Sequence, residues 1–362
     1  MNYEDRGRPH GTVQPPFEPV RQAFAAVLQE QRGTGAAVAV WLDGRWIVDL
    51  WGGTANASGT RMWQWDSIVQ PYSVTKPFAA LCALRLIDRG SLDLDALVQR
   101  YWPEFLAPAT VRHVLSHQAG VVALDVQTST DSFYDWGHMC ALLAAQQPQW
   151  PPGTAHGESA LFYGHLVGEL VRRVDGRTLG RFLRDEVCAP LALDFTVGLT
   201  PEEQSRAVDL TCFDQLEPAS GTDLYGRAVG NPPGSRDPAV VNSAVWRAAE
   251  IPAINGHGTA RGVAGLYAAL LSGELLSPAL LHETMSVQCS GIDAVFSHHN
   301  SWGLGFALDD QGFGMGGLGG NYGGACTQGR YAIGFVTGTM GGPARGERVE
   351  NVLRGCLGLP PL

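Results

Sequence analysis

The sequence predicts an α/β protein in which an antiparallel sheet with flanking helices is interrupted by an inserted all-α domain. Two short apolar segments near the N-terminus, residues 36–42 and 46–51, are joined by a turn and are typical of a β-hairpin. Strand-like segments with glycine-rich connections return near the C-terminus, whereas the middle of the chain carries mainly helical patterns. This order implies a discontinuous α/β domain, residues 1–89 and 236–362, with a mainly helical insertion at residues 90–235.

The remaining elements follow from apolar spacing and from cap residues. Residues 17–31 carry a helical repeat, and Asp43–Arg45 forms the turn of the hairpin. Thr and Gly residues at the expected ends, such as Thr110, are typical helix caps. Further helices are expected at about residues 73–90 and at residues 110–117, 131–147, 159–173, 179–187, 258–271, 280–285 and 349–356, and strands at residues 302–308, 312–324 and 331–338.

Composition excludes several classes of protein. A chain of 362 residues with 45% hydrophobic and 17% charged residues can bury a large core and is not disordered. The net charge of −10, with no cluster of Lys or Arg, argues against a nucleic-acid partner. Seven cysteines without close pairs argue against a disulfide framework or a zinc site, so we expect core cysteines and no metal or cofactor.

The sequence contains no signal for a membrane or for export. It has no run of 18 apolar residues, and residues 1–6 lack the apolar segment of a secretory signal. A cytoplasmic location without a membrane partner is therefore expected. Residues 1–16 are polar and proline-rich and are expected to lie loosely on the surface. No feature indicates an oligomeric state.

The strongest candidate for chemistry is the segment Gln-Pro-Tyr-Ser-Val-Thr-Lys-Pro-Phe, which contains Ser73 and Lys76 and runs into a densely apolar helix. Residues three apart share a helix face, so the Lys76 amine can reach the Ser73 hydroxyl. Free N–H groups at a helix N-terminus favour an alkoxide or oxyanion there. The pair is a candidate nucleophile and base, provided that burial lowers the pKa of Lys76. Alone, the tetrapeptide also fits a helix cap followed by a chance lysine.

Several stretches accompany this motif in a fixed order. They are Pro71–Pro77, Asp93–Asp95, Val111–Gly120, Trp150–Thr154, Gly258–Arg261 and Trp302–Phe306. From about residue 17 to the C-terminus the chain resembles the serine β-lactamase superfamily, and most closely its class C-like branch, the family VIII carboxylesterases. The resemblance implies the β-lactamase/penicillin-binding-protein-like fold and an acyl-enzyme mechanism. Ser73 would attack an ester or amide carbonyl, Lys76 would take its proton with help from a tyrosine, and backbone N–H groups would form the oxyanion hole.

The second motif of that family is altered. Where members have His-Gly-Tyr-His-Ala or Tyr-x-Asn, this chain has His-Gly-Glu-Ser-Ala, so Glu158 replaces the catalytic tyrosine. A carboxylate in contact with Lys76 would hold the amine protonated. Two outcomes are open: a dead ion pair beside Ser73, or Glu158 acting as the base, directly or through a water. Tyr163 and Tyr72 are candidates to supply a hydroxyl and to bind substrate.

The third motif is altered as well. The esterase pattern Phe-Gly-His-x-Gly-x-Gly-Gly appears as Phe-Gly-Met-Gly-Gly-Leu-Gly-Gly, with Met315 in place of His or Lys. Methionine carries no charge and donates no hydrogen bond, so a carboxylate ligand is not expected. Its flexible apolar side chain favours a hydrophobic ligand instead. Met315, Gly316 and Gly317 are therefore expected to line the substrate site.

Other motifs have simpler explanations. His113 and His117 lie four apart on a short helix, but no carboxylate accompanies them at ligand spacing, so their role is expected to be structural. The glycine-rich residues 316–324 lack the Gly-Lys-Ser/Thr of a phosphate-binding loop. No Gly-x-Ser-x-Gly occurs, which argues against an α/β-hydrolase.

Together these features predict a cofactor-free serine esterase or acyltransferase acting on a small, largely apolar ester or acyl donor. The altered motifs suggest a specialised biosynthetic role, as in secondary metabolism. Two alternatives stay open: a non-catalytic binding protein with this fold, and a non-acyl enzyme in which Glu158 and Lys76 perform acid/base chemistry. In each case we expect Ser73, Lys76 and Glu158 to line one pocket between the two domains.

Overall fold

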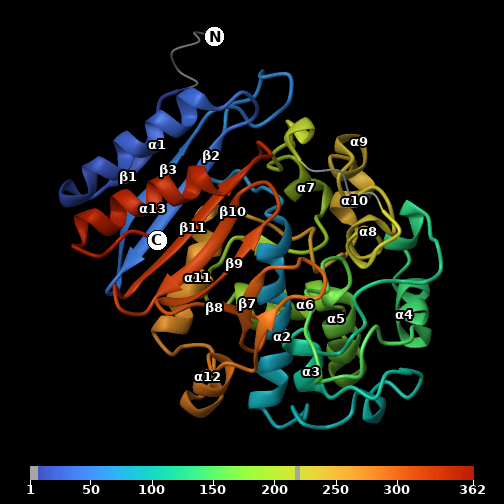
Figure 1. The fold of residues 1–362 in the computed structure, drawn as a ribbon. Coiled ribbons are helices and arrows are strands. Elements are labelled where there is room, and N and C mark those ends of the chain that lie inside the picture. The colour runs from blue at the N-terminus through green and yellow to red at the C-terminus, as the bar shows by residue number, and fades with distance from the viewer. Residues whose placement is uncertain (1–6, 217–220) are drawn as a thin grey trace.

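A computed structural model describes residues 7–216 and 221–362. Its centre is one antiparallel sheet with the strand order β1-β3-β2-β11-β10-β9-β8-β7-β6. The strands come from the two ends of the chain, drawn in blue and in orange to red in Figure 1, which confirms the discontinuous sheet. They are β1 (His10–Val13), β2 (Ala36–Leu42), β3 (Arg45–Gly52), β6 (Cys289–Ile292), β7 (His299–Trp302), β8 (Ala307–Leu308), β9 (Gly312–Gly317), β10 (Asn321–Cys326) and β11 (Tyr331–Thr337).

Helices cover both faces of this sheet. Helices α1 and α13 pack together on one face, α11 lies against the other, and α2 separates the sheet from the helical region (Figure 1). The helices are α1 (Glu18–Glu30), α2 (Thr75–Asp88), α3 (Val111–Leu115), α4 (Trp136–Ala145), α5 (Tyr163–Asp175), α6 (Leu179–Leu183), α7 (Pro201–Gln204), α8 (Leu224–Gly230), α9 (Pro238–Val241), α10 (Ala244–Ala248), α11 (Ala260–Leu271), α12 (Pro278–Thr284) and α13 (Ala344–Cys356). A small second sheet pairs β4 (Phe195–Thr196) with β5 (His257–Gly258). Within the described ranges, no helix is long and apolar enough to span a membrane.

Strand β2 shows how one sheet serves two cores. Val38 and Val40 pack with α1 and α13, whereas Ala37 and Ala39 belong to the larger core that includes α2 and α11. Successive side chains of a strand point to opposite faces, so a strand buried on both sides must be apolar at every position. This explains why residues 36–42 form an unbroken apolar run.

The glycine-rich strands allow α11 to approach the sheet closely. A Cβ atom at Gly323 would lie 2.5 Å from Val263 Cγ1, and one at Gly334 would lie 2.5 Å from the carbonyl oxygen of Ala260. These glycines therefore serve helix–sheet packing and do not form a ligand-binding loop.

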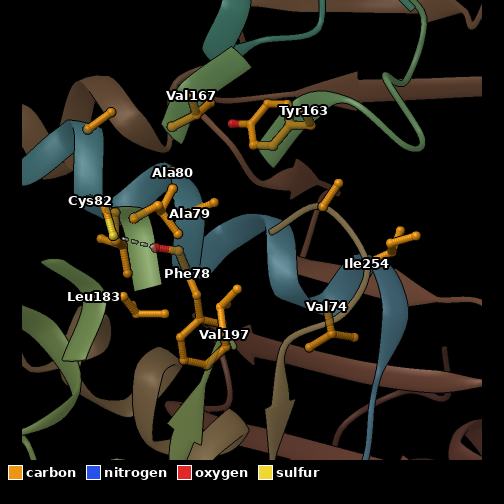
Figure 2. Close-up of a cluster of buried hydrophobic side chains, with 14 of the residues drawn as sticks. Val74, Phe78, Ala79, Ala80, Cys82, Tyr163, Val167, Leu183, Val197 and Ile254 are labelled. Atoms are coloured by element: carbon orange, nitrogen blue, oxygen red, sulfur yellow. Dashed lines mark hydrogen bonds between the residues drawn. The ribbon is translucent and has the colours of Figure 1, made fainter. Parts of the chain in front are cut away.

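Helix α2 is buried on nearly every side, as its dense apolar sequence predicts. Figure 2 shows its side chains enclosed by residues from α5 and α6, and the Cys82 thiol donates to the carbonyl of Phe78 at 3.3 Å. The ring of Phe78 stacks on that of Phe195 with centroids 3.6 Å apart. A 3₁₀ turn at Tyr72–Val74 precedes the helix, which begins at Thr75. The packed helix thereby fixes the turn that carries Ser73.

Two expectations about the N-terminal half need correction. Residues 10–13 do not lie loosely on the surface, because they form β1 and pair with β3 along the edge of the sheet. The expectation for residues 1–6 falls outside the described part of the chain. The helix expected from residue 159 begins at Tyr163, because the residues before it are held in an irregular segment by hydrogen bonds described below.

The C-terminal half differs in two further places. The strand expected at residues 302–308 is divided into β7 and β8, because the chain turns at Gly303, whose N–H donates to the carbonyl of Phe306. Helix α13 begins at Ala344, five residues before the expected start. The boundaries of the helical insertion at residues 90–235, of which residues 217–220 are not described, stay a prediction.

Candidate active site

Ser73 lies on the wall of a cavity of about 240 Å³. The residue before it, Tyr72, has a φ of +50°, a conformation that is uncommon for a side chain of this size. The Lys76 amine, one turn further on, donates to Ser73 Oγ at 2.7 Å. The sequence expectation that a hydroxyl and an amine meet at the start of α2 is confirmed.

Lys76 is almost completely buried, and its amine has three acceptors within about 3 Å and a fourth, the carbonyl oxygen of Ala253, at 3.5 Å. Besides Ser73 Oγ, the nearest acceptors are Glu158 Oε1 at 2.9 Å and the carbonyl oxygen of Ala160 at 3.0 Å. Burial lowers the pKa of Lys76 from its ordinary value, and the Glu158 carboxylate opposes that shift. Because an ammonium group has three N–H bonds, this arrangement satisfies the protonated form completely.

Glu158 is held by its main chain as well as by its side chain. Three successive N–H groups are hydrogen-bonded: Gly157 donates to the carbonyl of His117 at 3.1 Å, Glu158 to Asp293 Oδ2 at 2.9 Å, and Ser159 to His117 Nδ1 at 3.2 Å. The carboxylate accepts from the Ser73 hydroxyl at 3.3 Å and is 15% exposed. The acid is therefore fixed beside the serine.

Ser73 and Glu158 both line the cavity, but Lys76 does not. The expectation that all three residues line one pocket is thus wrong for Lys76, because its amine is turned inward toward backbone carbonyls. The amine nonetheless contacts both of the other side chains.

Tyr72 and Gly316 line the cavity as expected, but Gly317, which was expected to line it as well, is not among the lining residues. The Tyr72 hydroxyl donates to the carbonyl of Ser235 at 2.9 Å, and burial raises the pKa of this phenol. A side chain at Gly317 would collide with the carbonyl of Pro71. This glycine therefore allows the end of β9 to pass directly over the turn that precedes Ser73.

Tyr163 and Met315 are not among the residues that line the cavity. The Tyr163 hydroxyl donates to the carbonyl of Leu115 at 3.1 Å within the helical core, and burial raises its pKa. Met315 is buried opposite Gly323 in the β9–β10 ladder, on the face against which α11 packs. The expectation that these two side chains line the substrate site is thus wrong for this cavity, because Tyr163 packs in the helical core and Met315 is buried within the sheet.

Most of the cavity wall was not anticipated from the sequence. The wall comes from several segments far apart in the chain, and the additional residues are Ala160, Leu161, Val229, Ser235, Arg236, Ile254, Phe296 and Leu318. Asp293 was missed too, since a single Asp in a Gly-Ile-Asp turn carries no local signal. The structural role expected for His117 is confirmed, because its ring packs between Tyr163 and Trp302 and its Nδ1 anchors the segment of Glu158.

No group of three or more His, Cys, Asp or Glu residues that could hold a metal ion occurs in residues 7–216 and 221–362.

Comparison with known proteins agrees with this geometry. The chain is 35% identical over 284 residues to the Esterase/beta-lactamase LipL of Mycobacterium tuberculosis, an alignment that covers 74% of this chain and 65% of LipL. It is 27% identical over 176 residues to the Monacolin J acid methylbutanoyltransferase of Aspergillus terreus, covering 41% and 43% of the two chains. The chain thus spans less than two thirds of the length of these relatives.

A crystal structure of a family VIII carboxylesterase superposes with a TM-score of 0.89 at 34% identity, covering 96% of this chain and 100% of the other. The family model described as Beta-lactamase matches residues 20–355. With the Ser73–Lys76 pair at the start of a buried helix beside an antiparallel sheet, these findings show that the chain belongs to the β-lactamase family, whose relatives here include the carboxylesterase branch.

Proposed function

We propose that the protein is a serine-dependent esterase or acyltransferase that forms an acyl-enzyme at Ser73 with a small, largely apolar ester or acyl donor. One observation carries the proposal: the Ser73 hydroxyl, at the cavity wall, contacts both the Lys76 amine and the Glu158 carboxylate. A nucleophile within hydrogen-bond reach of a base that is itself oriented by a third group is the arrangement of covalent catalysis.

In this proposal Glu158 takes over the proton transfer of the missing tyrosine. Ser73 Oγ adds to the carbonyl carbon while its proton moves to Glu158, and a tetrahedral oxyanion forms. When the oxyanion collapses, the leaving alkoxide takes the proton from Glu158 and the acyl group stays on Ser73. A water or an acceptor alcohol then attacks the acyl-enzyme, with Glu158 again receiving and returning the proton.

Lys76 acts in this scheme as an ammonium and not as the base. Its three nearest acceptors, with the carbonyl of Ala253 at 3.5 Å as a fourth, satisfy all three N–H bonds of the charged form, which has no lone pair for the Ser73 proton. The positive charge stabilises the developing alkoxide at Ser73. Backbone N–H groups of the Ser73 turn and of the end of β9 would stabilise the oxyanion, together with the partial positive charge at the start of α2.

The cavity supports a small apolar acyl group. Most of its wall is apolar, including Leu161, Ile254 and Phe296, and its volume of about 240 Å³ is small. Pockets for drug-sized ligands span roughly 300–1,000 Å³. The names of two relatives, an esterase and a methylbutanoyltransferase, support ester or acyl substrates, and the second supports a specialised biosynthetic role.

A second candidate function is favoured by the closed ion pair. The contact of 2.9 Å between Lys76 and Glu158 is also what a non-catalytic binding protein would contain after losing proton transfer. A third reading uses the same pair for acid/base chemistry without an acyl-enzyme, with Ser73 only hydrogen-bonding to the substrate.

Labelling and turnover separate these functions. Incubation with a fluorophosphonate or with p-nitrophenyl acetate should add mass at Ser73, and Ser73→Ala should abolish turnover. Turnover retained in Ser73→Ala but lost in Glu158→Gln would support the acid/base enzyme. An absence of turnover with every donor, combined with tight binding of an ester analogue, would support the binding protein.

A further inference from the structure

Asp293 lies in the connection between β6 and β7, and its side chain is completely buried. Its Oδ2 accepts from the N–H of Glu158 at 2.9 Å and from Asn300 Nδ2 at 3.1 Å. Its Oδ1 accepts from the N–H groups of Val295 at 2.8 Å and Phe296 at 2.9 Å. A carboxylate offers roughly four acceptor sites, so these four neutral donors fill it.

The same connection holds the residues before Glu158 at two further points. Asn300 Oδ1 is 2.7 Å from His156 Nε2, and the N–H of Ala294 donates to the carbonyl of His156 at 2.9 Å. The segment that carries Glu158 is therefore fastened to residues 293–300 by three separate hydrogen bonds, one of which goes to the Asp293 carboxylate itself.

Asp293 also fixes part of the cavity wall. Phe296, whose N–H it binds, lines the cavity beside Ser73 and Glu158. One buried carboxylate thus sets the position of an acid and of an apolar wall that come from distant parts of the chain. Hydrogen bonds to a charged acceptor are stronger than those to a neutral one. The Asp293 carboxylate therefore holds these N–H groups more tightly than the amide of an asparagine would.

We infer that Asp293 is a positioning residue, which holds the Glu158 carboxylate at the Ser73 hydroxyl and keeps the Phe296 wall in register with it. The inference rests on the proposed function, in which Glu158 exchanges the proton of Ser73. Asp293 contacts neither of these side-chain groups and acts through the main chain of Glu158.

The test compares two carboxylate-to-amide variants of the full-length protein. Asp293→Asn keeps the size of the side chain but replaces one acceptor oxygen by a donor, so the N–H of Glu158 or one of its neighbours loses its partner. We expect kcat for p-nitrophenyl acetate to fall about 100-fold, the cost of a misplacement of about 1 Å, while KM changes only a few-fold.

The matched control is Glu250→Gln. The Glu250 carboxylate also binds a main-chain N–H, that of Gly180 at 3.0 Å, and the hydroxyl of Thr178 at 2.7 Å, but it does not line the cavity. This variant should lower the melting temperature and leave kcat unchanged. A structural role alone for Asp293 would give the same result for both variants.

The outcomes distinguish this inference from the proposed function. If the wild type turns over through Ser73 and Asp293→Asn has the wild-type kcat, the inference is overturned and the function stands. If the wild type is inactive with every donor, the proposed function fails, and the crystal structure of Asp293→Asn decides the inference. We expect the Glu158 carboxylate to lie more than about 4 Å from the Lys76 amine, beyond ion-pair distance; a contact that stays near 2.9 Å would overturn the inference.

Discussion

Glu158 and Glu169 lie in the same region of the chain, and the groups around each carboxylate give the same type of side chain two different roles. The Glu169 carboxylate accepts from the Trp136 indole at 2.8 Å, from Arg172 at 2.7 and 2.8 Å, and from Arg173 at 2.7 Å. Burial raises the pKa of Glu169, but these donors outweigh it and lower the pKa to about 2.

Glu158 has fewer side-chain donors than Glu169. Its side chain contacts one buried amine and one hydroxyl, and it faces a cavity. The Glu169 carboxylate accepts hydrogen bonds from three side chains and stabilises the fold. The Glu158 carboxylate instead contacts the hydroxyl of Ser73, whose proton is transferred in the proposed reaction. The two carboxylates therefore differ in the hydrogen-bond donors around them and in their access to the cavity. The predictions below test this difference.

The largest effect is expected from Glu158→Gln. Because an amide cannot accept the Ser73 proton, kcat/KM for p-nitrophenyl acetate should fall by about 10²–10⁴-fold, the usual contribution of general acid–base catalysis. The melting temperature should fall as well, because the buried Lys76 ammonium loses its counter-charge. Steady-state kinetics and thermal unfolding on the same preparation check both parts.

Glu158→Tyr, which restores the phenol found in relatives of the family, is the matched variant. It should retain more activity than Glu158→Gln, because a phenol can carry a proton between substrate and serine. If the tyrosine variant instead exceeded the wild type while the glutamine variant equalled it, Glu158 would be the inhibitory half of a dead ion pair.

Glu169→Gln should reduce stability and leave kcat at the wild-type value. With a pKa of about 2 in the folded state and 4.5 as the ordinary value, the ionised form of Glu169 stabilises the fold at pH values above 4.5. At about 1.4 kcal/mol per pKa unit, the contribution is about 3 kcal/mol. It should be lost as the pH falls from 4.5 towards 2. Urea unfolding at pH 7 and at pH 3 measures it; an equal loss at both pH values would contradict the assignment.

The pH dependence of the rate tests the charge of Lys76. Burial lowers the pKa of Lys76 below its ordinary 10.5, so the amine loses its proton at a lower pH than a free lysine does. If the ammonium is required, kcat/KM should fall about tenfold per pH unit above that lowered pKa. A rate that rises through the same range would show that neutral Lys76 is the base. A donor without a titratable leaving group serves as the control.

The smallest effect is expected at His165, whose ring packs at a tilt against the Trp136 ring that Glu169 binds, with ring centroids 4.8 Å apart. Burial lowers the pKa of His165 to about 3 from 6.5, so the fold favours the neutral ring. Below pH 6.5 the unfolded chain takes up a proton that the folded chain does not, and stability should fall by about 1.4 kcal/mol per pH unit. His165→Phe should reduce the slope of the unfolding free energy between pH 6.5 and 5 by about that amount, while the buried His117 and His257 keep their own contributions; urea unfolding measures it. If the unfolding free energy had the same pH slope in the wild type and in His165→Phe, the contribution assigned to His165 would be contradicted.

Local patterns predicted most of the fold and the centre of the site. The hairpin of β2 and β3, the buried helix α2 and the spacing of Ser73 and Lys76 depend on neighbours in the sequence, so their signals are visible there. The resemblance to the family, at the motif around residue 158, placed the acid correctly beside the amine.

Long-range contacts account for what could not be predicted. The pairing of β1 depends on an edge of the sheet that polar residues 10–13 do not reveal. Tyr163 turns into the helical core because its hydroxyl finds the carbonyl of Leu115 there. Asp293 acts on Glu158 from 135 residues away, a relation that no local pattern contains.

The contact of Gly317 with the carbonyl of Pro71 limits how the pocket can change. Any larger residue at this position would push the strand away from the turn that carries Ser73. If the proposed acyl-enzyme forms, variation in acyl-chain preference should therefore arise from side chains that line the cavity, such as Val229 and Phe296.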